Sequence, residues 1–187
     1  VPLDENYAFS PEALLGACDE KTTIIFICSP NNPTGNAFSH DKIEKVLKEF
    51  SGIVIVDEAY SEFSRVRPFR FDIGKYPNII VLNTFSKAWG CAGIRLGMAF
   101  ASTDIIGLMN KVKYPYNVNV LTQQRATETL GNPTLMQRHI SMIIDERATL
   151  MKAFSDLPIC NEVYPTDANC FLAKVTDADK IYDYIVH

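Results

Sequence analysis

Ile53-Val54-Ile55-Val56-Asp57-Glu58-Ala59-Tyr60 reads as a short strand that ends abruptly in polar residues. A near-continuous apolar run of this length is typical of a strand covered on both faces, as in parallel sheets. Similar runs occupy residues 23–28 and 79–82. A helix with one apolar face is predicted over residues 39–50, between the runs at 23–28 and 53–56. Strands that alternate with helices in this way predict an α/β fold around a mostly parallel sheet with flanking helices.

Further elements follow from apolar spacing and from capping residues. Ser10 and Pro11 open a short predicted helix that runs to Ala17, since serine favours the N-cap and proline the first helical position. The Pro/Asn/Gly cluster at residues 30–36 predicts a loop. Residues 62–75 are expected to be loop with a helical turn. Downstream, one strand is expected over residues 98–101, and helices are expected over residues 104–111, 118–130 and 133–154.

The pattern changes near Cys160. Residues 162–164 and 170–175 are interpreted as strands, and a helix capped by Asp177 or Asp179 is expected to run to His187. We therefore predict that residues 1–155 form part of a large domain and that residues 156–187 begin a small α+β domain.

Composition excludes several classes of protein. The net charge is −4 with scattered Lys and Arg, which argues against a nucleic-acid surface. No apolar run approaches the length of a membrane span. Five cysteines without a Cys-x-x-Cys pair favour a reducing cytoplasm, and the three histidines have no metal-ligand spacing, so no metal site is expected.

Lys87 is the strongest candidate for covalent chemistry. It lies in Asn83-Thr84-Phe85-Ser86-Lys87-Ala88-Trp89-Gly90, directly after the third predicted strand. A lysine amine among small hydroxyl residues is suited to form a Schiff base with the aldehyde of pyridoxal 5′-phosphate (PLP). The alternative for an isolated lysine at such a place is an ordinary surface residue.

Asp57 is the candidate partner of the cofactor's pyridine nitrogen. A carboxylate at the end of a buried strand needs a partner, and the protonated ring nitrogen is a suitable one. The alternative is that Asp57 caps backbone amides. Glu58 is not expected to form a dyad with Asp57, because adjacent strand residues point to opposite faces.

The 3-oxygen and the phosphate of PLP also have candidate ligands in the sequence. Tyr60 and Asn32 can hydrogen-bond the cofactor's 3-oxygen, although a half-buried tyrosine and a turn asparagine are the plainer interpretations. Arg95 can hold the phosphate with help from Ser86 and Thr84, and its alternative role is an ion pair with a helix carboxylate.

Taken together, these motifs resemble the fold-type I, class I and II aminotransferases. The resemblance rests on Asn32-Pro33-Thr34-Gly35, on Asp57-Glu58-Ala59-Tyr60, and on Ser86-Lys87 with Arg95. More narrowly, residues 29–36, 57–63, 113–119 and 166–169 resemble the histidinol-phosphate aminotransferases.

The resemblance implies PLP as cofactor, Lys87 as both its attachment point and the group that moves the substrate proton, and the other roles as assigned above. It implies amino transfer from histidinol phosphate to 2-oxoglutarate in histidine biosynthesis, by a cytoplasmic homodimer. Those family members carry further segments on both sides, so we expect this chain to be a fragment that is inactive by itself.

Two alternatives to this function stay open. One is another class I or II aminotransferase, or a decarboxylase of the threonine-phosphate type. The other is a catalytically inert fragment that only folds or self-associates.

Overall fold

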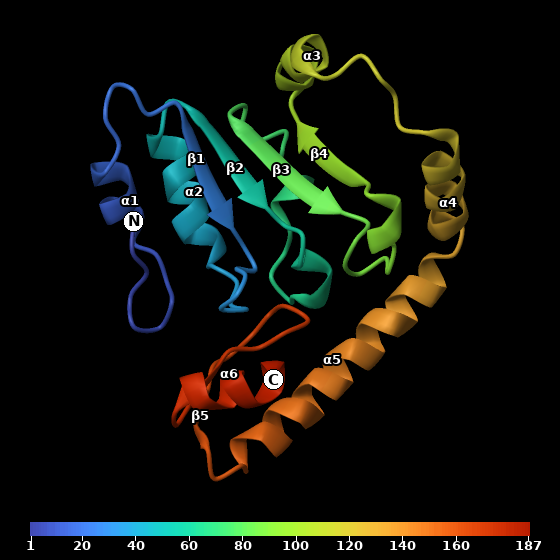
Figure 1. Cartoon of the computed structure of the whole chain (residues 1–187). Coiled ribbons are helices and arrows are strands. Elements are labelled where there is room, and N and C mark those ends of the chain that lie inside the picture. Colours follow the sequence, from blue (N-terminus) through green and yellow to red (C-terminus); the bar gives the residue numbers. More distant parts are fainter.

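The computed structural model describes residues 1–187, and its centre is a four-stranded sheet in the order β1-β2-β3-β4 (Figure 1). The strands are β1 (Ile24–Cys28), β2 (Ile53–Asp57), β3 (Ile79–Thr84) and β4 (Gly97–Ala101). The β1–β2 and β2–β3 pairs are parallel, and β3–β4 is antiparallel. The predicted α/β class with a mostly parallel sheet is therefore confirmed.

One face of this sheet carries the main core. The helix α2 (His40–Glu49) packs its apolar stripe against this face, beside the shorter helix α1 (Pro11–Gly16). Ser10 caps α1 as predicted, since its hydroxyl accepts a hydrogen bond from the amide of Ala13 at 3.1 Å. The core is formed by alternate residues of the strands and by one side of α2: Ile25, Ile27, Val54, Val56, Ile79, Val81, Ile43, Val46 and Leu47.

The prediction that the first strand is buried on both faces was wrong. Ile25 and Ile27 are buried beneath α2, but Ile24 is 47% exposed and Phe26 is 71% exposed. Adjacent strand residues point to opposite faces, and α1 and α2 both pack on the Ile25 side. A run of apolar residues thus predicts a strand, but it does not show whether other elements cover both faces of that strand.

Beyond the sheet, the chain continues through α3 (Thr103–Val112), α4 (Val120–Leu130) and the long α5 (Pro133–Ser155). Figure 1 shows α5 running diagonally from α4 toward the C-terminal part of the chain. All three helices were predicted, with boundaries that differ by no more than a few residues. No helix is both long and apolar enough to cross a membrane.

The C-terminal part forms a separate two-stranded antiparallel sheet of β5 (Cys160–Val163) and β6 (Ala173–Val175), followed by α6 (Ala178–Val186). Asp177 caps α6, as one of the two expected candidates. The second strand is shorter than predicted, because the carbonyl of Cys170 accepts a hydrogen bond from the Thr166 hydroxyl inside the connecting loop. The division into domains at residue 155 stays a prediction.

Candidate active site

The candidate residues gather at one edge of the sheet. The parallel strands β1, β2 and β3 have Cys28 opposite Asp57 and Asp57 opposite Leu82, so their carboxyl ends meet at that edge. The loops that leave these ends carry Asn32, Tyr60 and Lys87. Ligand sites of open α/β sheets lie outside the carboxyl ends of the strands, which makes this edge the place to look for one.

Asn32 and Lys87 both lie beside Tyr60, although the three residues belong to three different loops. The amide Nδ2 of Asn32 donates to the phenol oxygen of Tyr60 at 2.8 Å, and the amine of Lys87 lies 5.1 Å from the centroid of the Tyr60 ring. Tyr60 is 7% exposed, which makes it more buried than the half-buried alternative supposed. Lys87 and Asn32 remain exposed, so a ligand could reach the amine.

Asp57 is the last residue of β2 and is half-buried. Its Oδ1 accepts a hydrogen bond from the amide of Ala59 at 2.9 Å, as the capping alternative supposed. Its Oδ2 makes no hydrogen bond within the chain and is free to bind a further donor. The strand register places Asp57 on the face of the sheet opposite α2.

The predicted phosphate ligands lie at the end of β3 and on the segment that joins it to β4. The Thr84 hydroxyl donates to the carbonyl of Leu96 at 3.3 Å and accepts from the amide of Ser86 at 3.0 Å. Arg95 precedes Leu96, whose carbonyl is the acceptor of the Thr84 hydroxyl, so its backbone lies beside the end of β3. Arg95 has a left-handed backbone with φ of 53°, and its guanidinium donates to the carbonyl of Ala92 at 3.0 Å. It makes none of the ion pairs with helix carboxylates that were the alternative.

Glu58 points away from this group, as predicted from the pleat. It lies under α2 and accepts a hydrogen bond from the amide of Phe69, and the guanidinium of Arg70 lies 3.7 Å from its Oε2. Burial raises the pKa of Glu58 from 4.5 to about 7, against the opposing effects of the Phe69 amide and of Arg70. Burial disfavours the charged form of a carboxyl group, which is the physical cause of this direction.

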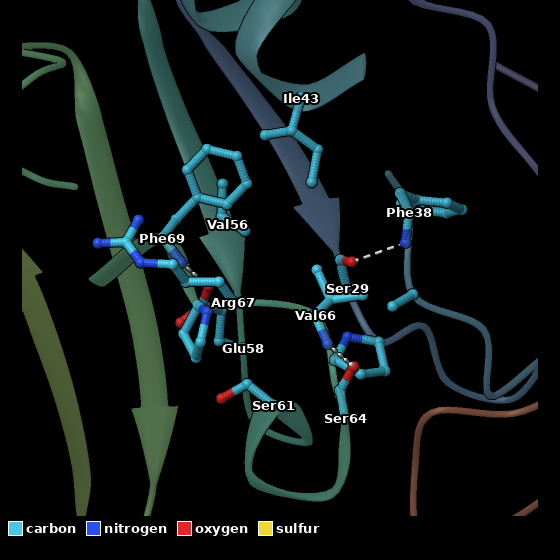
Figure 2. A pocket seen from close by; sticks show the side chains of 13 residues that line it. Ser29, Phe38, Ile43, Val56, Glu58, Ser61, Ser64, Val66, Arg67 and Phe69 are labelled. Carbon is cyan, nitrogen blue, oxygen red and sulfur yellow. Dashed lines mark hydrogen bonds between the residues drawn. The ribbon is translucent and has the colours of Figure 1, made fainter. Parts of the chain in front are cut away.

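A small cavity of about 10 Å³ lies beside Glu58, on the α2 side of the sheet. A void of this size holds on the order of one water molecule. Figure 2 shows its walls, where the amide of Phe38 donates to the Ser29 hydroxyl at 2.9 Å. Its lining includes Ser29, Ile43, Val56, Glu58, Ser64 and Phe69, and none of the predicted cofactor ligands. This cavity is therefore a packing void and no substrate pocket.

The donor set at the carboxyl edge of the sheet fits PLP group by group. The cofactor offers an aldehyde, a ring nitrogen, a 3-oxygen and a phosphate. The chain presents an amine, a carboxylate with a free oxygen, a phenol paired with an amide, and a guanidinium and two hydroxyls on the segment that joins β3 to β4. The individual role of each residue stays a prediction.

The chain is similar to known aminotransferases. Residues 1–185 match the family described as aminotransferase class I and II. The chain is 56% identical over 186 residues to the histidinol-phosphate aminotransferase of Bacteroides thetaiotaomicron, which covers 100% of this chain and 54% of that protein.

Two solved structures share the fold. The histidinol-phosphate aminotransferase of Clostridium acetobutylicum superposes with a TM-score of 0.89 at 24% identity, over 98% of this chain and 57% of that one. The enzyme of the same name from Sinorhizobium meliloti, in complex with pyridoxal-5′-phosphate, gives 0.87 at 20% identity, over 100% of this chain and 51% of that one.

The chain belongs to the class I and II aminotransferases, and the predicted family is confirmed. The particular relatives that it resembles are the histidinol-phosphate aminotransferases, as the narrower motifs indicated. The chain spans about half the length of the curated relatives it matches.

One feature of the site was not predicted from the sequence. The loop between β5 and β6 reaches the loops that carry Asn32 and Tyr60 (Figure 1). The only signal in the sequence was the resemblance of residues 166–169 to the narrower family, and it predicted no contact.

Proposed function

We propose that the protein containing this sequence is a PLP-dependent aminotransferase and that the carboxyl edge of the sheet holds the cofactor. The observation that carries the proposal is the convergence of Lys87, Tyr60 and Asn32 from three loops, directly beyond Asp57. The alternative, an ordinary surface lysine, does not account for this convergence. Family membership supports the same conclusion.

Each side chain has a definite task in this proposal. When bound, PLP supplies an electron sink that makes the substrate's α-proton acidic. Lys87 attaches the cofactor, and its Nζ then accepts the proton that leaves the α-carbon. Asp57 holds a proton on the ring nitrogen through its free oxygen. Tyr60 and Asn32 together hydrogen-bond the 3-oxygen.

The phosphate would be held by Arg95 with Thr84 and Ser86. A guanidinium offers planar paired donors that match a phosphate, and hydroxyls add further donors. Arg95 donates to the carbonyl of Ala92 through one guanidinium nitrogen, Nη1, which leaves its other N–H groups available to the phosphate.

We propose histidinol phosphate as amino donor and 2-oxoglutarate as acceptor. The support is the name shared by relatives that are 49–56% identical over the chain. A cytoplasmic homodimer with a large domain (residues 1–155) and a small one (from residue 156) completes the proposal. The exposed side chains of Tyr114 and Tyr116 between α3 and α4 are candidates for the dimer contact.

The cofactor proposal is tested by titrating the chain with PLP and recording the visible spectrum. An absorption band near about 400 nm is expected from the lysine-bound cofactor. Lys87→Ala should abolish it, whereas Lys111→Ala, an exposed lysine of α3, should keep it. A band that survives Lys87→Ala would contradict the assignment.

The substrate proposal is tested on the natural chain that contains this sequence with its flanking residues. Histidinol phosphate should convert the bound cofactor to its amino form, and 2-oxoglutarate should restore the original spectrum. Conversion by another amino acid but not by histidinol phosphate would overturn the substrate and leave the cofactor site intact.

A further inference from the structure

The loop between β5 and β6 makes an unexpected connection to the candidate site. Asp167, in the middle of this loop, accepts a hydrogen bond from the amide of Ala37 at 3.0 Å through Oδ2. Its Oδ1 accepts from the Ser64 hydroxyl at 3.2 Å. One carboxylate therefore joins two segments that precede it in the sequence by 130 and 103 residues.

These two segments are the ones that carry the predicted 3-oxygen ligands. Ala37 directly follows the loop of residues 30–36, which contains Asn32. Ser64 ends the 3-10 helix Ser61–Phe63, which begins directly after Tyr60. The Asn32–Tyr60 hydrogen bond and the Asp167 bridge thus span the same pair of loops.

The Asp167 bridge is itself held firmly. The amide of Asp167 donates to the carbonyl of Gly35 at 2.7 Å. The next residue, Ala168, is 1% exposed and packs in one cluster with Tyr60. Its carbonyl accepts from Arg147 of α5, which ties the loop to the long helix. A bridge with so many anchors can fix the separation of the two site loops.

We propose that Asp167 is a positioning residue that sets the Asn32–Tyr60 pair in the geometry required for the cofactor's 3-oxygen. The proposal rests on the cofactor site described above. Side chains that bind a ligand must be held to within a fraction of an ångström by supporting contacts, and Asp167 supplies such contacts to both loops at once. It would also couple the C-terminal sheet to the site.

The first test needs no cofactor. NMR would follow hydrogen exchange of the Asn32 side-chain amide in the cofactor-free chain. In Asp167→Ala we expect this exchange to be about tenfold faster, since the amide loses its fixed partner. The side-chain amide of Asn78, which donates to three carbonyls at the far end of β2, should not change and reports any general loosening.

The second test is the apparent Kd for PLP, read from the absorption band near about 400 nm. We expect it to rise about tenfold in Asp167→Ala, equivalent to about 1.4 kcal/mol. Asp167→Asn should stay within about twofold, because its oxygen can accept from Ala37 and its amide can donate to Ser64. The matched control Asp156→Ala removes an exposed acid at the end of α5 and should change neither readout.

Ser64→Ala keeps the proposal testable should Asp167→Ala fail to fold, since it removes only one arm of the bridge. We expect about threefold effects on the exchange rate and on the Kd for PLP. Unchanged Asn32 exchange in both variants would overturn the proposal. If the natural protein that contains this sequence shows no Lys87-dependent band, the cofactor site is wrong, and the exchange rates still decide whether Asp167 positions Asn32.

Discussion

Glu58 should make the free energy of unfolding of this chain depend on pH, and the substitution Glu58→Gln should remove that dependence. The side chain is 2% exposed and its pKa is raised by burial from 4.5 to about 7. Between these pH values the folded chain holds a proton on Glu58 that the unfolded chain has lost. Unfolding then releases a proton, so the free energy of unfolding must fall as the pH rises through this window.

The size of the effect follows from the two pKa values. Their difference is about 2.5 pH units, from 4.5 to about 7. At about 1.4 kcal/mol for each unit, the loss approaches ~3 kcal/mol once the pH exceeds about 7. That is a large share of the ~5–15 kcal/mol that stabilises a typical domain.

Urea denaturation at pH 5, 6, 7 and 8 would measure this dependence. Glu58→Gln keeps an acceptor for the amide of Phe69 but cannot ionise, so the variant should gain up to ~3 kcal/mol over the unmodified chain between pH 5 and pH 8. Glu20→Gln removes an exposed acid that forms no ion pair and is no neighbour of Glu58, and it should leave the slope unchanged. Parallel losses of stability in Glu58→Gln and the unmodified chain would show that Glu58 does not cause the pH dependence.

Two further pairs of substitutions test the fold by urea denaturation. Ile27→Ala should lower the free energy of unfolding by ~3 kcal/mol, because Ile27 is buried beneath α2. Phe26→Ala, on the open face of the sheet, should lower it by less than ~1 kcal/mol, and equal losses would show that this face is not open. Gly35→Ala should cost ~2 kcal/mol, since its φ is +83° and a Cβ would lie 2.4 Å from Thr166 Oγ1. Gly16→Ala has nothing within 4 Å and should change stability by less than ~0.5 kcal/mol, so equal effects at the two glycines would contradict the close packing.

Local patterns predicted the elements well because they depend on neighbouring residues. The apolar run at residues 53–56 became β2, and the helical stripe after Ser39 became α2. The opposite directions of Asp57 and Glu58 also followed from the strand pleat alone. These features need no knowledge of distant parts of the chain.

Long-range features could not be predicted in this way. Phe26 looks like a core residue in the sequence, and only the position of α2 shows that it is exposed. Asp167 lies 130 residues from Ala37, and no local pattern predicts that pairing. Arg95 was predicted to bind the phosphate, but nothing near it in the sequence indicates the left-handed backbone that it adopts.

The most direct test of the cofactor site is to identify the lysine that PLP modifies. The chain would be incubated with PLP, reduced with borohydride to fix the bond, digested and analysed by mass spectrometry. We expect a pyridoxyl group on Lys87 at substoichiometric PLP, with the other lysines unlabelled. Labelling spread evenly over exposed lysines, or concentrated at a lysine other than Lys87, would contradict it.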